Sequence, residues 1–304
     1  MNRLVRGGGL LALLFAASCG EGPGEDAAPP AATETAPAGQ LYTRTFVFLG
    51  RRDGAPLVVP FSFTAVRGPE GTLRTARGWL AHGPTWDRFL DQSWQSWGQG
   101  THWRVLPTEE LRVFVGGPAE LESLLFERGE RTLRLDITGV AAAWTPVGPL
   151  RVRLLQGRLN LAGERVTGPV LEVQRIGSAD AAGLPFEWLF LTGEGVEPLV
   201  AARSGGEAGW ARLGEEERSG EQLTLEWTEL RPLEEARRDI PTAWRLGVPR
   251  ERVTGRVTAS GFDAVLGEER RGRRAAEVFY TVEGEFTTGG DTREVYGVAH
   301  HAQN

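Results

Sequence analysis

The chain of 304 residues carries a formal charge of −6 and is 40% hydrophobic, which is enough apolar material for a large core in one or two domains. All 34 basic residues are arginine and there is one cysteine, which excludes Schiff-base and P-loop lysine chemistry, an internal disulfide and a cysteine-based metal site. The acidic balance argues against a nucleic-acid partner and no dinucleotide or metalloprotease motif is present, so we expect no cofactor and no metal.

The first twenty residues predict export and a lipid anchor. Arg3 and Arg6 precede a short apolar run at 10–15, which suits a signal peptide because a membrane span needs about 20 apolar residues. Small residues then lead to Cys19 in a block that resembles a bacterial lipobox, although Ala16 stands where leucine is usual. We therefore expect a lipoprotein signal peptide at 1–18 and lipid on Cys19. The alternative is an ordinary secretory signal that is cut nearby.

Gly20, the residue after Cys19, indicates in which membrane the lipoprotein is anchored. Gly20 is not the aspartate that would suggest retention in the inner membrane, so the outer membrane is favoured. Residues 19–40 have no aromatic and no large aliphatic side chain, and such a segment cannot bury enough surface to order itself. We expect a disordered tether that holds the folded part of the chain away from the lipid head groups.

From Leu41 onward the apolar residues recur with a period of two. This alternation is typical of strands with one buried and one wet face, and it is clearest at 57–65, 133–137, 222–228, 253–258 and 277–283. Glycine-rich turn signals separate the segments, among them Asp53-Gly54, Gly163-Glu164 and Gly289-Gly290. The pattern predicts an all-β fold of two antiparallel barrels or sandwiches with few short helices.

Two segments instead show helical spacing. Pro84–Trp97 places its aromatic residues at steps of three and four, and Pro232–Ile240 is a short stretch between two prolines. The first segment belongs to the densest aromatic cluster of the chain. We name as candidate ligand-binding residues Trp86, Phe89, Trp94, Trp97 and Trp103. The competing interpretation is that this stripe is core; stacking on a sugar is a variant of the ligand interpretation.

His82 and His102 flank this aromatic segment. In a chain without lysine and with one cysteine they are the obvious candidates for a base near neutral pH, should the protein be an enzyme. A surface or hydrogen-bonded histidine is the alternative for each.

A resemblance appears at two stretches, Gly157–Gly168 and the closing run from Val282 to His301, with a Pro-Thr-Ala-Trp-Arg-Leu block at Pro241–Leu246 before the second. They resemble the lipocalin-like family related to carotenoid 1,2-hydratase, also called the AttH type. The resemblance implies two barrel-like β domains in tandem and, in some members, hydration or binding of apolar polyene-like molecules. It also implies an acid-His-x-Trp-Gly block after Gly168, but the chain reads Leu171–Gly177 without histidine or tryptophan, so we transfer no catalytic residue.

The charged residues near the C-terminus are expected to be solvent-exposed. Glu277, Glu283 and Glu285 share one strand face, and Glu268–Arg274 has the composition of a solvated hairpin tip that could also touch anionic head groups. His300 and His301 would point to opposite faces of a strand and could not easily share a metal. We expect this pair to lie in a frayed tail.

The sequence thus predicts an exported protein, anchored in the cell envelope through Cys19, with lipocalin-like domains at 41–178 and 184–304. Its expected function is the binding of an apolar small molecule in a β-barrel or inter-domain cavity. One alternative is a cofactor-free hydratase or isomerase that acts on a polyene-like substrate. The other is a glycan-binding module that uses stacked tryptophans.

Overall fold

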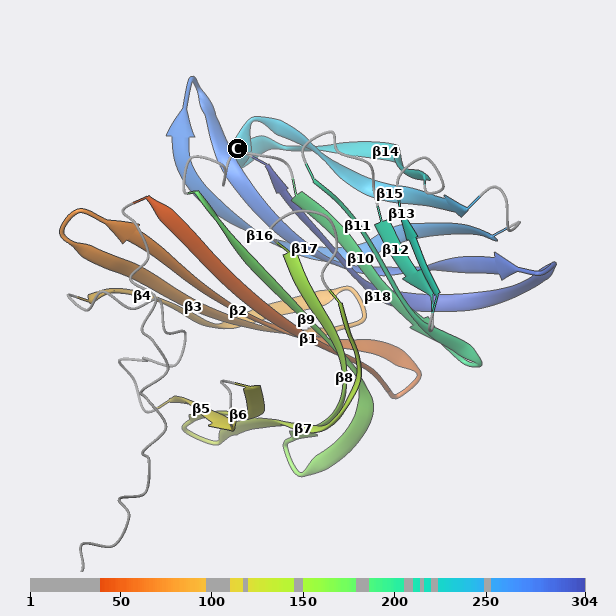
Figure 1. The fold of residues 1–304 in the computed structure, drawn as a ribbon, viewed down its shortest axis with the longest axis horizontal. Helices are drawn as coiled ribbons and strands as arrows, with labels where there is room; N and C mark the ends of the chain where they lie inside the picture. Colours follow the sequence, from red (N-terminus) through yellow and green to blue (C-terminus); the bar gives the residue numbers. More distant parts are fainter. Residues whose placement is uncertain are drawn as a thin grey trace, which may run out of the picture. The chain divides into compact units, whose positions relative to one another are not determined.

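The computed structural model describes residues 39–96, 110–116, 120–144, 150–178, 186–204, 210–213, 216–219, 224–248 and 253–303 (Figure 1). The expected signal peptide, Cys19 and nearly all of the tether lie outside these residues, as do Trp97, His102 and Trp103. Residues 35–304 form one compact unit. Within the described part of the chain, no helix is long and apolar enough to cross a bilayer.

The first sheet has nine antiparallel strands in the order β4-β3-β2-β1-β9-β8-β7-β6-β5. It is a meander whose first strand pairs with its last, so that β1 and β9 lie in the middle (Figure 1). Its strands are β1 (Gln40–Arg52), β2 (Ala55–Gly68), β3 (Gly71–His82), β4 (Thr85–Ser96), β5 (Leu111–Gly116), β6 (Glu120–Arg128), β7 (Arg131–Trp144), β8 (Leu150–Leu161) and β9 (Glu164–Ser178).

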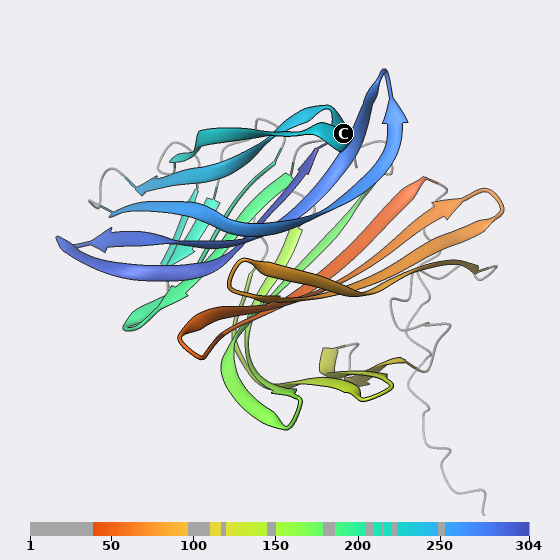
Figure 2. The ribbon, with the colours of Figure 1, turned by 180° about the vertical axis from the view of Figure 1, so that it is seen from behind.

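The second sheet repeats this plan strand for strand, in the order β13-β12-β11-β10-β18-β17-β16-β15-β14 (Figure 2). Its strands are β10 (Phe186–Gly193), β11 (Val196–Ser204), β12 (Trp210–Leu213), β13 (Glu216–Ser219), β14 (Thr224–Leu233), β15 (Arg238–Val248), β16 (Val253–Arg270), β17 (Arg273–Thr288) and β18 (Asp291–Gln303). The predicted all-β fold of two antiparallel sheets is confirmed. The domain limits at 41–178 and 184–304 stay a prediction.

Several of the predicted turns have the backbone that a tight hairpin requires. Asp53 and Gly54 join β1 to β2 with φ values of 51° and 80°, and Gly289 and Gly290 join β17 to β18 with 60° and 98°. Two successive positive φ angles define a type I′ turn, whose twist matches the right-handed twist of the strands. Asp-Gly and Gly-Gly are the pairs that adopt it most readily.

Each sheet has an inner face with its own apolar core, and a third core joins the two sheets. On β1, Phe46 and Phe48 belong to the core of the first sheet, while the alternate residues Val47 and Leu49 pack in the third core. On β10, Leu189 likewise faces inward and Trp188 faces the third core. The central strands are therefore apolar on both faces, which explains their nearly continuous hydrophobic runs.

The predicted helix at Pro84–Trp97 is wrong, because Thr85–Ser96 is strand β4. A bulge opposite the Gly78–Trp79 step leaves Phe89 unpaired between Arg88 and Leu90. Phe89 and Leu90 consequently both enter the inner core, whereas Trp86 packs on the opposite face. One extra residue in a strand thus changes which face of the sheet the following apolar residues point to. The resulting spacing mimics the three- and four-residue steps of a helix.

The second predicted helix, Pro232–Ile240, is largely strand as well. Only Glu234–Ala236 is helical, as a single 3-10 turn between β14 and β15. Arg237 ends it in the left-handed conformation at φ 53°, and its backbone N–H bonds to the Glu234 carbonyl.

Candidate functional site: the cleft between the sheets

The structure separates the residues of the predicted tryptophan site. Trp94 packs against the inner core of the first sheet, and Trp86 packs against the third core on the other face. His82 is exposed at the end of the β3–β4 hairpin, where its Nε2 lies 3.0 Å from the Arg52 carbonyl oxygen. It pairs with Thr85, nine residues before Trp94 along β4, or roughly 30 Å. His82 and Trp94 therefore do not share a site.

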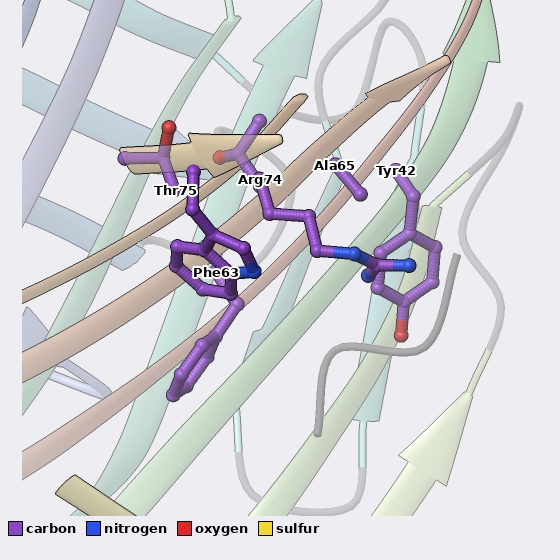
Figure 3. Close-up of a pocket in the computed structure, with 7 residues that line it drawn as sticks. Tyr42, Phe63, Ala65, Arg74 and Thr75 are labelled. Atoms are coloured by element: carbon purple, nitrogen blue, oxygen red, sulfur yellow. The ribbon is translucent and has the colours of Figure 1, made fainter. Parts of the chain in front are cut away.

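Trp94 borders a small pocket on the inner face of the first sheet. The other residues that line it are Tyr42, Phe63, Thr64, Ala65, Arg74 and Thr75. Figure 3 shows the Arg74 side chain extended along this pocket toward Tyr42. The cavity measures about 10 Å³, room for about one water molecule. A cavity of this size is too small for an organic ligand. A ligand-binding role for Trp94 therefore has no support from this pocket and stays a prediction.

A larger cavity of about 270 Å³ lies between the two sheets, which we call the cleft. Strands β1, β2, β3 and β9 form one wall, and β10, β16, β17 and β18 form the other. The first wall offers three threonines, a serine and two arginines, and the second is mostly apolar. Residues of the two walls include Thr43, Thr45, Ser62, Thr64, Arg77, Val173, Arg175, Phe186, Trp188, Val265, Leu266, Glu277 and His300.

An acid–histidine pair, which we call the dyad, lies on the second wall of the cleft. His300 Nε2 and Glu277 Oε1 are 3.1 Å apart, and the His300 ring stacks on Trp188 at 5.1 Å with an interplanar angle of 17°. The other ring nitrogen, Nδ1, has no hydrogen-bond partner among the described residues. The dyad therefore fixes the orientation of the imidazole, with Nδ1 buried and unpaired.

The first wall supplies a positive charge to the dyad. Arg77 Nη1 lies 3.7 Å from Glu277 Oε2, and its Nε bonds to Asp91 at 3.0 Å. Burial alone would raise the pKa of Glu277, but the His300 contact and the charges of His300 and Arg77 outweigh it and lower this pKa. Glu277 is thus a carboxylate near neutral pH, able to stabilise a protonated His300.

These positions correct two sequence-based interpretations. His300 and His301 do not lie in a frayed tail: they are 6% and 1% exposed on β18, which lies between β10 and β17. Glu277 is only partly exposed and pairs with His300, whereas Glu283 and Glu285 are exposed as expected. The two histidines do point to opposite faces of the sheet, as the strand period requires.

The missing acid-His-x-Trp-Gly block also maps to the cleft. Glu172 is followed by Val173 and Arg175, and both of these residues line the first wall. They belong to the run Leu171–Gly177, in which the chain has neither the histidine nor the tryptophan that the resemblance implies. The residues of this run that line the first wall include no acid–base group, whereas the second wall carries the dyad.

On its inner face the second sheet holds another buried network, around Glu187. This carboxylate is 2% exposed and accepts hydrogen bonds from Trp244 Nε1 at 2.7 Å, Trp227 Nε1 at 2.8 Å and Arg203 Nε at 2.7 Å. His301 Nδ1 lies 3.5 Å away. Burial alone would raise the pKa of Glu187, but His301, Arg203 and Trp244 together lower it. The network connects β10, β11, β14, β15 and β18 across the inner face.

Tyr280 lies in the same core as Trp244 and packs edge-on against it at 5.2 Å. Its hydroxyl has no hydrogen-bond partner among the described residues. Burial and the charge of Glu187 raise its pKa, so it stays protonated. The dyad, by contrast, lines the cleft. Sequence reasoning assigned none of these residues to a site.

The described residues contain no group of three histidine, cysteine, aspartate or glutamate side chains placed to hold a metal ion. His300 and His301 cannot form one, because each faces a different core.

Solved structures share this fold. An AttH-type protein of Nitrosomonas europaea is 14% identical over 87% of this chain and 92% of its own, with a TM-score of 0.60. Kievitone hydratase from Nectria haematococca is 14% identical over 88% and 89% of the two chains, with a TM-score of 0.54. CghA with Sch210972 is 12% identical over 87% and 88%, with a TM-score of 0.55. No protein-family model and no curated protein matches the chain. The shared fold is the one that the AttH resemblance implied.

Proposed function

We propose that the cleft binds a small, largely apolar molecule that carries at least one polar or anionic group. The observation that carries this proposal is a cavity of about 270 Å³ whose walls combine apolar side chains with arginines and a histidine. Binding sites of this kind are mostly apolar, with a few placed polar groups that fix the ligand's orientation. Trp188 and Phe186 offer flat apolar surface, and Arg175 lies over the Phe186 ring at 5.4 Å. CghA, which has this fold, has a crystal structure with Sch210972.

A titration with anilinonaphthalene sulfonate, an apolar fluorophore with one negative charge, tests this proposal. Ala275 lines the cleft, so Ala275→Phe should fill it and remove most of the fluorescence gain. Ala143→Phe, on the exposed part of β7, is the matched control and should bind as the wild type does. Equal binding by wild type and both variants would place the fluorophore elsewhere and contradict the proposal.

The dyad favours a second function, cofactor-free hydration or isomerisation of an apolar unsaturated ligand in the same cleft. In hydration, protonated His300 gives its proton to one carbon of a double bond. Water then bonds through oxygen to the other carbon and loses a proton to the imidazole, so no electrons leave the substrate. Glu277, 3.1 Å from Nε2, stabilises the positive charge on the ring. Kievitone hydratase, which shares the fold, supports a reaction of this class.

Kievitone is a suitable first substrate for this second function. The full chain should convert it to a product heavier by one water, as seen by mass spectrometry. His300→Gln should abolish the conversion, whereas His82→Gln, which changes an exposed histidine outside the cleft, should retain it. Conversion that survives His300→Gln would remove the dyad from the reaction.

We also propose that Cys19 carries lipid and that the protein is anchored in the cell envelope, more favourably in the outer than in the inner membrane. The apolar run at 10–15 and the small residues before Cys19 support this proposal. An apolar ligand that partitions into the bilayer would then lie close to a protein held at the membrane surface.

A further inference from the structure

A second, more polar cavity lies at one end of the second sheet. It measures about 320 Å³ and forms where the β14–β15 connection meets the start of β17 and the end of β18. Three arginines line it, Arg237, Arg238 and Arg273, together with Glu234, Asp239 and Gln303. It shares no residue with the cleft.

Backbone carbonyls, rather than carboxylates, hold two of these arginines. Arg238 Nε donates to the Arg274 carbonyl oxygen at 2.7 Å, and Arg237 Nη1 donates to the Gly272 carbonyl oxygen at 3.2 Å. A carbonyl orients a guanidinium without cancelling its charge. The ion pair of Arg237 with Glu269, at 3.6 Å, joins two exposed side chains and is therefore weak.

Two of the three lining arginines, Arg238 and Arg273, have no counter-ion among the described residues. The Arg273 side chain makes no hydrogen bond or ion pair with any residue that the structure describes, and the Arg238 side chain makes no ion pair with them. Burial and the like charge of Arg273, which lines the same cavity, both lower the pKa of Arg238. Glu234 and Asp239 are exposed and bond to neither of them. An anion between Arg238 and Arg273 would relieve this repulsion.

We propose that this cavity binds a phosphate group, either of a soluble phosphomonoester or of an anionic lipid. Guanidinium groups recognise phosphate oxygens through paired, charge-assisted hydrogen bonds. The Nη groups of Arg238 and the whole guanidinium of Arg273 remain available for such bonds, since Arg238 is fixed through its Nε alone. Gln303 is oriented by its own bond, from Nε2 to the Asp239 carbonyl at 3.1 Å.

Two probes distinguish the sources of phosphate. The full chain, in a zwitterionic detergent at low ionic strength, is titrated calorimetrically with glycerol 3-phosphate. For the lipid arm, Cys19→Ser protein free of detergent is sedimented with phosphatidylcholine vesicles that contain or lack phosphatidic acid, because detergent dissolves vesicles and a lipid on Cys19 would anchor the chain in both kinds. Arg273→Gln is the informative variant, because Arg273 holds no structural bond whose loss could unfold the chain. Arg256→Gln, an exposed arginine on β16 outside the cavity, is the matched control.

We expect saturable binding that Arg273→Gln weakens about tenfold, the effect of one charge-assisted hydrogen bond to phosphate, while Arg256→Gln leaves it unchanged. Binding of glycerol 3-phosphate supports a soluble ligand. Binding of phosphatidic acid vesicles alone, with the same dependence on Arg273, supports a lipid head group. The proposal is overturned if neither probe binds, or if both variants weaken binding equally.

Discussion

Replacing Glu187 by glutamine tests the buried network of the second sheet. In the wild type the carboxylate accepts hydrogen bonds from two indole N–H groups and from Arg203, and its side chain is almost completely buried. A glutamine keeps one acceptor oxygen and turns an NH₂ group toward donors, so Arg203 loses its counter-charge. Removing one partner of a buried charge pair costs about 3–5 kcal/mol.

For a chain of this size each kcal/mol shifts the melting temperature by about 2–4 °C, so Glu187→Gln should melt about 6–20 °C below the wild type. The loss of strand structure on heating can be followed by circular dichroism at about 218 nm. Glu226→Gln, an exposed glutamate on β14, is the matched control and should change the melting temperature little. If Glu187→Gln and Glu226→Gln have the same melting temperature, the network does not stabilise the sheet.

The pH dependence of stability gives a second reading of the same residue. Because the pKa of Glu187 is lowered in the folded state, its contribution is complete above the unfolded pKa of about 4.3 and is lost as the pH falls through the folded pKa. The wild type should therefore lose stability below about pH 4 more steeply than Glu187→Gln. If the free energy of unfolding falls equally steeply with decreasing pH in the two proteins, Glu187 is not a stabilising carboxylate.

Three further changes probe other parts of the molecule. Gly261→Ala would bring a Cβ atom into the Pro84 carbonyl of the other sheet, so it should lower the melting temperature strongly. Gly139→Ala, with open space around it, should not. Equal melting temperatures for the two variants would mean that the sheets do not approach at Gly261. Trp94→Ala should cost up to about 3 kcal/mol on denaturant unfolding, less than a fully buried tryptophan, and leave fluorophore binding unchanged; loss of binding without loss of stability would return the ligand site to Trp94. Cys19→Ser should move the protein from the membrane fraction to the soluble fraction with an unchanged melting temperature, and a wild type that incorporates no fatty acid would contradict the lipid anchor.

The strands and tight turns were predictable because their signals are local. Residues 57–65 and 277–283 alternate, and Asp53-Gly54 carries its turn type in its own two residues. The failure at Thr85–Ser96 has the same origin. A bulge depends on the partner strand, here at the Gly78–Trp79 step, and nothing within the segment distinguishes it from a helical turn.

The candidate site was not predictable, because it depends on pairing between distant segments. β18 is a central strand only because it pairs with β10, more than a hundred residues earlier, so His300 and His301 resemble a chain end in the sequence. The partners of Glu187 are 16, 40 and 57 residues away along the chain. The tryptophans at 79–103 formed the conspicuous local cluster, but the structure divides its described members between two faces.

The most direct test of the cleft as the functional site is a crystal structure of the full chain grown with anilinonaphthalene sulfonate. We predict fluorophore density between the two sheets, with its rings beside Trp188 and its sulfonate near Arg175, and no such density in Ala275→Phe. Density beside Trp94 on the inner face of the first sheet, or a cleft that remains empty at saturating fluorophore, would contradict the account.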